Sequence, residues 1–166
     1  YSRVRVQKGK MYLFNFMHPS ADKLFYFSLF GRNGLIEHQS LIPHESIEDY
    51  LAEFVSLLYR YKPIVPLCHT KLFGREARGT SFSGHGYCLA FHVPNNEKNK
   101  EFLNKIDLLD LKYGCITNIA KDSRVSKENI LKQYSGRIEQ FKKSLNDYDP
   151  SHVFSNRIAQ EILDLC

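Results

Sequence analysis

Two histidines and one lysine stand on predicted strands where their side chains could meet a ligand. His69 and Lys71 lie two residues apart on one strand, so the two-residue period of strands turns both side chains to the same face. Lys71 could bind a phosphate or a sugar hydroxyl, although a solvated lysine at a strand end fits equally well. His38 stands alone on another strand, where it could act as a base or hydrogen-bond donor, but a lone strand histidine is more often structural or exposed.

The cysteines and the remaining histidines do not suggest a metal centre. No CxxC pair exists, and the spacings match no zinc module. We therefore expect no metal, and reduced thiols in a reducing, cytoplasmic compartment. Apolar neighbours of Cys88 favour a small buried residue rather than a nucleophile. The residues considered for metal binding are Cys68, Cys88, Cys115, Cys166, His69, His85 and His92.

A charged run, Lys121-Asp122-Ser123-Arg124, occupies a predicted junction between a strand and a helix. Taken alone, Lys121 is most simply a surface lysine. Asp122 and Arg124 could pair with each other or brace the loop, because short polar side chains commonly bond locally at such junctions. Ser126 is the expected N-cap of the following helix.

Hydrophobic periodicity predicts an α+β fold with an antiparallel sheet flanked by helices. The predicted strands cover residues 35–42, 64–73 and 87–93, and the predicted helices cover 46–61 and 95–113. Asn95 or Asn96 should begin the second helix and Gly114 should end it. Ser46 with Asp49 resembles a capping box at the start of the first.

Other segments carry weaker signals. The aromatic-rich runs at 3–17 and 24–30 favour strands, and the glycine-rich stretch 74–86 suits either a substrate cover or a disordered connection. From residue 115 the pattern becomes a short extended piece followed by helices. These helices are expected at 126–134, 137–147 and 155–165, with Asp149-Pro150 separating the last two.

The overall composition bounds the function. Hydrophobic residues make up 43% and charged residues 25%, which indicates a globular chain rather than a disordered one. The net charge is +5, but the basic residues are scattered, so we expect no nucleic-acid partner. Because the chain begins at Tyr1, we expect it to be part of a longer polypeptide.

Ordered sequence blocks give this chain a specific resemblance. They are 34–43 (GLIEHQSLIP), 71–74 (KLFG), 86–91 (GYCLAF), 120–124 (AKDSR) and 148–155 (YDPSHVFS). The chain resembles the C-terminal region of the vanillyl-alcohol-oxidase superfamily of FAD-linked oxidoreductases, and within it the branch acting on a polyprenyl-phosphate pentose. The similarity covers roughly residues 34–165.

The resemblance implies a domain division and a cofactor. Residues 1–114 would be the C-terminal part of the substrate-binding cap domain, and 115–166 a helical segment completing the FAD-binding domain. The pyrophosphate-binding part of that domain would precede this chain in the same polypeptide. This chain alone should therefore hold FAD poorly and lack activity. The substrate would be a sugar or sugar phosphate, and a lipid-linked one would be associated with a membrane.

The resemblance also implies roles for individual residues. Lys121 would stand beside the flavin and the substrate, where a fixed cation stabilises the negative charge of the reduced ring. His38 would be the second catalytic residue. Residues expected to bind substrate are Lys71, Cys88, Phe73, His69 and Asn118, and those expected to bind cofactor are Lys121 and Asn118.

Three departures from the family pattern leave the exact sugar open. They are His38 in place of a tyrosine, Gly86 in place of an amide residue and Asn118 in place of an aromatic residue. One alternative is a sugar-lactone or other alcohol oxidase of the same superfamily. Another is a non-catalytic α+β module that binds a ligand or a protein. Oligomeric state and electron acceptor are open.

Overall fold

The computed structural model describes residues 10, 12, 13, 28–74, 76, 79–154 and 160. The predicted strand at 3–17 and the predicted helix at 155–165 lie almost wholly outside these residues. Residues 28–30, at the end of the aromatic run 24–30, are helical rather than extended.

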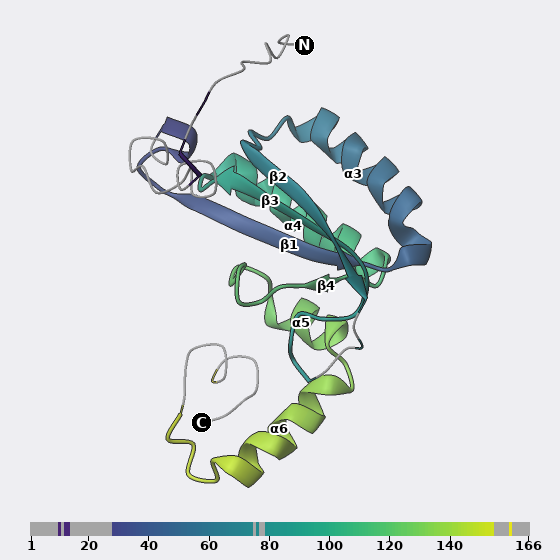
Figure 1. The fold of residues 1–166 in the computed structure, drawn as a ribbon, viewed down its shortest axis with the longest axis vertical. Helices are drawn as coiled ribbons and strands as arrows, with labels where there is room; N and C mark the ends of the chain where they lie inside the picture. Colours follow the sequence, from purple (N-terminus) through teal and green to yellow (C-terminus); the bar gives the residue numbers. More distant parts are fainter. Residues whose placement is uncertain are drawn as a thin grey trace.

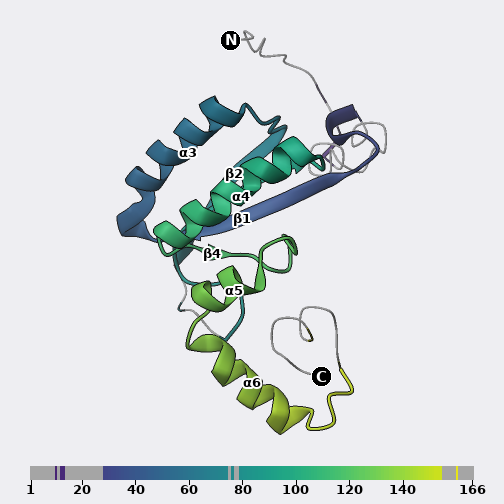
Figure 2. The ribbon, with the colours of Figure 1, turned by 180° about the vertical axis from the view of Figure 1, so that it is seen from behind.

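The centre of the fold is a four-stranded antiparallel sheet in the order β2-β3-β1-β4. The strands are β1 (Leu35–Ile42), β2 (Leu67–Gly74), β3 (His85–Pro94) and the short β4 (Ile116–Thr117). Helices pack against this sheet (Figures 1 and 2), so the predicted α+β fold is confirmed. Two consecutive strands pair directly, and β1 lies between strands that come later in the chain.

Helices α3 (Ile47–Tyr61) and α4 (Glu97–Lys112) cover one face of the sheet. Seen from behind, α4 lies in front of the strands (Figure 2). The core between them is built from apolar side chains of the strands and both helices. Each large apolar side chain so buried stabilises the fold by about 1.5–3 kcal/mol. The fully or nearly fully buried members are Ile42, Tyr50, Phe54, Leu89, Phe91, Val93, Phe102, Leu103, Ile106 and Leu109.

The helix ends agree only partly with the expected caps. The Asn96 side chain accepts a hydrogen bond from the backbone N–H of Asn99 at 2.9 Å, as expected for the start of α4. Ser46 precedes α3 but makes no capping hydrogen bond. The expected capping box is therefore wrong. A 3-10 turn, η2 (His44–Ser46), leads into the helix and gives Ser46 a helical backbone instead of the extended one that a cap needs.

The chain after Gly114 forms a second cluster beyond the sheet. Gly114 takes a positive φ of 64°, a conformation that glycine adopts without steric cost. Helices α5 (Lys127–Gln133) and α6 (Arg137–Tyr148) follow β4, and α6 extends away from the sheet (Figure 1). Ser126 caps α5 by accepting from Asn129 N–H at 3.2 Å. The buried side chains of this cluster are Val125, Ile130, Tyr134 and Ile138.

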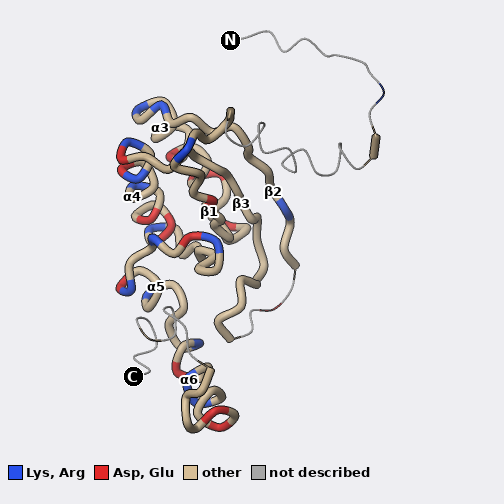
Figure 3. Tube along the Cα trace, turned by 90° about the vertical axis from the view of Figure 1, so that its left-hand side faces the viewer, with Lys and Arg blue, Asp and Glu red and all other residues tan. Residues whose placement is uncertain are grey.

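Helix α4 carries charged residues of both signs (Figure 3). Among the helices of the described residues, none combines the length and apolar character needed to cross a bilayer.

The division of the chain into two domains at residue 114 stays a prediction.

Candidate functional site

The face of the sheet turned away from α3 and α4 carries polar side chains, and we call it the outer face. Odd-numbered residues of β1 and β2 and even-numbered residues of β3 point to it, because their neighbours supply the core beneath the helices. Charged and ionisable groups form a row across this face, from the edge strand β2 to the loop after β4. In that order they are Lys71, His69, His92, Glu37 and Lys121.

Lys121 reaches the outer face from a tight turn. The backbone N–H groups of Lys121 and Asp122 both donate to the carbonyl of Asn118, at 3.0 and 3.1 Å. The Lys121 ammonium lies 3.2 Å from a carboxylate oxygen of Glu37. Its side chain is 49% exposed, so the ammonium stays accessible to a ligand on this face.

Glu37 is the acidic centre of the row. Its two carboxylate oxygens lie 2.5 Å from the donating amide of Gln39 and 3.6 Å from His92 Nε2. Although partial burial by itself raises the pKa of Glu37, hydrogen bonds from Gln39 and Lys121 and nearby positive charge hold it below its ordinary value. Glu37 is therefore ionised at neutral pH.

Asn118 organises the turn rather than pointing freely to solvent. Its side-chain carbonyl accepts from Ala120 N–H at 3.2 Å, and its amide donates to the side-chain carbonyl of Gln39 at 2.9 Å. Its backbone N–H also donates to the Gln39 carbonyl, at 2.9 Å, which extends the pairing of β1 with β4. In this structure, Asn118 holds the loop of Lys121 beside β1.

His69 and Lys71 share the outer face of β2, as their spacing predicted, and both are exposed. Partial burial and the positive charges of Lys71 and His92 lower the pKa of His69. The ring is therefore neutral at neutral pH and able to accept as well as donate a hydrogen bond.

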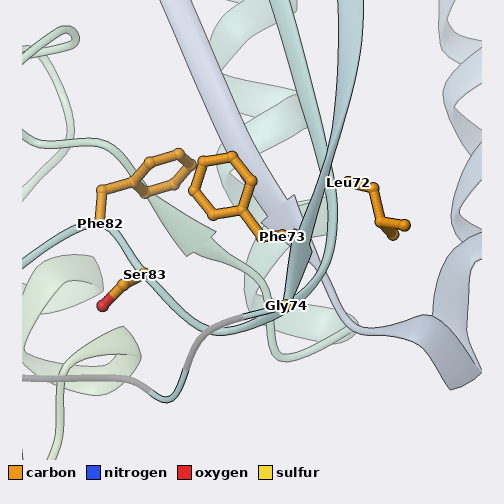
Figure 4. Close-up of a pocket in the computed structure, with 5 residues that line it drawn as sticks. All are labelled: Leu72, Phe73, Gly74, Phe82 and Ser83. Carbon is orange, nitrogen blue, oxygen red and sulfur yellow. The ribbon is translucent and has the colours of Figure 1, made fainter.

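Cys88 belongs to the outer face but is fully buried. It packs with Leu41 and Ala90, and Phe73 and Phe82 pack against this group. Figure 4 shows the two rings next to each other; they meet edge to face, with their centroids 5.5 Å apart and their planes at 68°. Because Phe82 comes from the glycine-rich loop, this loop and Phe73 stand over the end of the sheet that holds the thiol. Burial raises the pKa of Cys88, so it is an unreactive thiol here.

A hollow of about 350 Å³ lies beside these rings and is lined by residues of β2 and the loop. Leu72 turns away from Phe73 (Figure 4), as the alternation of a strand requires. The lining residues are Leu72, Phe73, Gly74, Phe82 and Ser83.

His38 lies on the other side of the sheet from the remaining candidates. It follows Glu37 in β1, so its side chain points beneath the sheet, where it is 0% exposed. Its Nδ1 lies 2.8 Å from Asp122 and its Nε2 lies 3.2 Å from Asp110. The expected contact between His38 and a substrate conflicts with this position, because no ligand on the outer face can touch a ring buried below it.

Asp110, on α4, accepts several hydrogen bonds beneath the sheet. Ser40 donates at 2.7 Å, Tyr50 at 2.8 Å and Thr117 at 3.1 Å, in addition to His38. Four segments of the chain therefore meet at one fully buried carboxylate. Such satisfied networks rigidify the elements that they join.

Arg124 completes the network. Its guanidinium donates two hydrogen bonds to Asp107, at 2.6 and 2.8 Å, and one to Asp122 at 3.0 Å. The Asp122 carboxylate also accepts from Arg124 N–H at 3.1 Å. The expectation that Asp122 and Arg124 pair and brace the loop is confirmed.

The buried ring of His38 carries a positive charge. Burial by itself lowers the pKa of His38, but hydrogen bonds to Asp110 and Asp122 and the charges of both carboxylates outweigh it and raise the pKa to about 9. Both nitrogens then donate: Nδ1 to Asp122 at 2.8 Å, and Nε2 to the hydroxyl oxygen of Ser40 at 2.8 Å and to Asp110 at 3.2 Å. Removing one partner of a buried ion pair lowers the free energy of unfolding by about 3–5 kcal/mol. An exposed pair such as Lys121–Glu37 adds only about 0–1 kcal/mol to it.

His38, Asp107 and Asp122 place potential ligand atoms within 4.8 Å of one another. The guanidinium of Arg124 already binds both of these acids. A cation between them would meet this positive charge, and we therefore interpret the group as an ion-pair network.

Glu37 and Gln39 were missed as site residues by the sequence analysis. The strand period places both on the face opposite His38, but it does not say which face of β1 is turned away from the helices. With them, the outer face brings together His69, Lys71, Lys121 and Asn118, with Phe73 and the covered Cys88 towards one end.

The sequence was compared with known proteins. No family model matches the chain. The chain is 27% identical over 134 residues to decaprenylphosphoryl-beta-D-ribose oxidase of Mycolicibacterium smegmatis. The alignment covers 80% of this chain but only 29% of that protein. This distant relative is an oxidase, and the similarity supports an oxidoreductase ancestry for the chain.

Proposed function

We propose that this chain forms the substrate-facing part of an FAD-dependent oxidoreductase that oxidises a sugar hydroxyl. The observation that carries the proposal is the row of accessible polar groups on the outer face, with Lys121 at one end and Lys71 at the other. Sugar hydroxyls and phosphate oxygens are acceptors for such cations. A pentose carried on a polyprenyl phosphate suits this row, and the distant relative's name points to the same substrate class.

The chemistry of the residues fits one part of FAD. An isoalloxazine ring gains negative charge when it is reduced, and the half-exposed ammonium of Lys121 suits it. A pyrophosphate is commonly bound by a glycine-rich turn between a strand and a helix. In the described part of the chain, the turns that lead from a strand into a helix contain no glycine. The pyrophosphate would therefore be held elsewhere in the complete protein.

The residues of the outer face would have different roles in the proposed reaction. A bound FAD would supply the acceptor for the hydride that leaves the carbon bearing the hydroxyl. Lys121 supplies a fixed positive charge where negative charge develops. Lys71 and His69 bind and orient the substrate through its oxygens. Glu37 is ionised and accepts a hydrogen bond from the substrate hydroxyl; with its lowered pKa it takes up the proton only as the hydride leaves and the hydroxyl becomes acidic.

The test is flavin reduction in the complete gene product, purified with its cofactor and mixed rapidly with candidate substrates. A polyprenyl-phosphate pentose, a free pentose and a sugar lactone would be compared. We expect Lys121→Ala to slow reduction at saturating substrate by about 100-fold, the usual effect of losing one electrostatic stabiliser.

The matched control is Lys132→Ala on α5, whose exposed side chain pairs, within the part of the chain that the structure describes, with Glu128 of the same helix. It should leave the rate unchanged. A complete protein that binds no flavin, or a Lys121→Ala variant reduced as fast as the parent, would refute the proposal.

A further inference from the structure

Two adjacent residues of β1 hold two adjacent residues of the loop after β4, one pair on each face of the sheet. On the outer face, Glu37 lies 3.2 Å from the ammonium of Lys121. Beneath the sheet, His38 Nδ1 lies 2.8 Å from the carboxylate of Asp122. The loop is thus fastened to the same strand from both sides.

The two attachments are unequal. The side chains of Lys121 and Glu37 are 49% and 19% exposed, so water and salt screen their attraction. Those of His38 and Asp122 are 0% and 1% exposed. Breaking the buried pair leaves the buried Asp122 carboxylate with Arg124 as its remaining cationic partner, whereas breaking the outer pair leaves two charges that water can reach. The buried pair therefore fixes the loop, and the outer pair leaves the ammonium able to change partners when a substrate arrives.

We propose that His38 is a positioning residue: by binding Asp122 beneath the sheet, it sets where the ammonium of Lys121 stands on the outer face. This inference rests on the proposed function, because it matters for activity only if Lys121 acts on the reaction. Its structural half, the tether itself, can be tested separately.

Groups of α4 and of the loop after β4 brace the tether directly, and α3 contributes a hydrogen bond to the other oxygen of Asp110. Asp110 of α4 binds the second nitrogen of the His38 ring, and Tyr50 of α3 donates to Asp110. Arg124, anchored on Asp107, holds Asp122 from the loop side. Among these groups, the carboxylates of Asp110 and Asp122 keep the ring protonated: burial lowers the pKa of His38, but the two acids outweigh it and raise the pKa to about 9.

The first experiment measures hydrogen–deuterium exchange in the complete protein with His38→Gln. The amides of Lys121 and Asp122, which bond to Asn118, should exchange at least about tenfold faster as the loop opens locally. The backbone amides of α4 serve as the internal reference, because they exchange when the whole domain opens. Tyr50→Phe is the matched control, since it removes one hydrogen bond of the same network and leaves the tether intact.

The second experiment measures flavin reduction in the same variants. We expect His38→Gln to lower the limiting rate at least about tenfold through misplacement of the ammonium, and Tyr50→Phe to leave it near the parent value. If His38→Gln does not fold, Asp122→Asn breaks the charge pair from the other side with little change in shape.

The outcomes separate the two ideas. Unchanged loop exchange would overturn the tether. Faster loop exchange with an unchanged reduction rate would overturn the positioning role. If Lys121→Ala were also as fast as the parent, the proposed function would fall while the tether stood.

Discussion

The buried imidazolium of His38 stabilises this fold at neutral pH, and this stabilisation is lost at alkaline pH. The pKa of His38 rises from its ordinary value of 6.5 to about 9 on folding, which corresponds to about 3 kcal/mol of stabilisation by the charged form. Because the folded pKa is the higher one, this stabilisation is complete below about pH 6.5 and is lost as pH rises through about 9.

The perturbation is His38→Gln, which keeps a polar side chain but cannot be charged. At about pH 6 we expect it to lower the free energy of unfolding by about 3 kcal/mol, the low end for a broken buried pair. The low end applies because Arg124 still neutralises Asp122, and Ser40 and Tyr50 still donate to Asp110. Above about pH 10 the variant and the parent should approach equal stability.

Urea unfolding at a series of pH values and fixed ionic strength measures this difference, with the slope checked for constancy. Burial raises the pKa of the Cys115 thiol and of the Tyr50 phenol, and both groups also weaken the fold at high pH. Both remain in the variant, so the difference between the two curves isolates His38. Parallel curves from about pH 6 to 10 would refute a charged His38.

Two further predictions concern packing. In urea unfolding, Gly86→Ala should lower the free energy of unfolding by more than about 3 kcal/mol, because a Cβ at this position would stand 2.1 Å from the carbonyl oxygen of Ile42. Gly74→Ala is the control, and it should have a small effect because there is open space around Gly74. Equal effects of the two substitutions would contradict the register of β3. Maleimide labelling followed by peptide mapping should modify the exposed Cys68 well before the buried Cys88 and Cys115, and fast labelling of Cys88 would show that Phe73 and Phe82 do not cover it.

The elements were predictable because local signals agreed with the tertiary fold. The apolar period of α3, the Asn96 cap and Gly114 at the end of α4 are all readable from neighbouring residues. The cap at Ser46 was not, because the residues before α3 continue into a 3-10 turn. Turn geometry of this kind depends on how Pro43 leaves the sheet, which the residue types do not reveal.

The side of the sheet on which His38 lies was not predictable. In β1, apolar residues occupy both alternating positions at each end, Leu35 with Ile36 and Leu41 with Ile42. The strand period therefore does not say which set faces the helices. His38 could be placed only once Ile36 and Ile42 were seen packing in the core.

The acids that surround His38 were hidden for a different reason. Asp107 and Asp110 are three residues apart on α4 and look like part of its charged surface. Both are buried, because their partners come from β1 and from the loop that carries Arg124. Partners that lie 17 to 72 residues away leave no local trace in the sequence.

The buried network is better explained by placement than by stability. An apolar cluster of the same volume would serve the core at least as well, since a buried ion pair seldom outweighs the cost of removing its charges from water. Apolar side chains can slide and repack, whereas the ring of His38 must be placed so that it binds both Asp122 and Asp110. That arrangement fixes Asp122, and the next residue back along the chain is Lys121, whose ammonium lies on the outer face. Under the proposed function, the network serves to hold the Lys121 ammonium in place, a task that a stable apolar core alone would not perform.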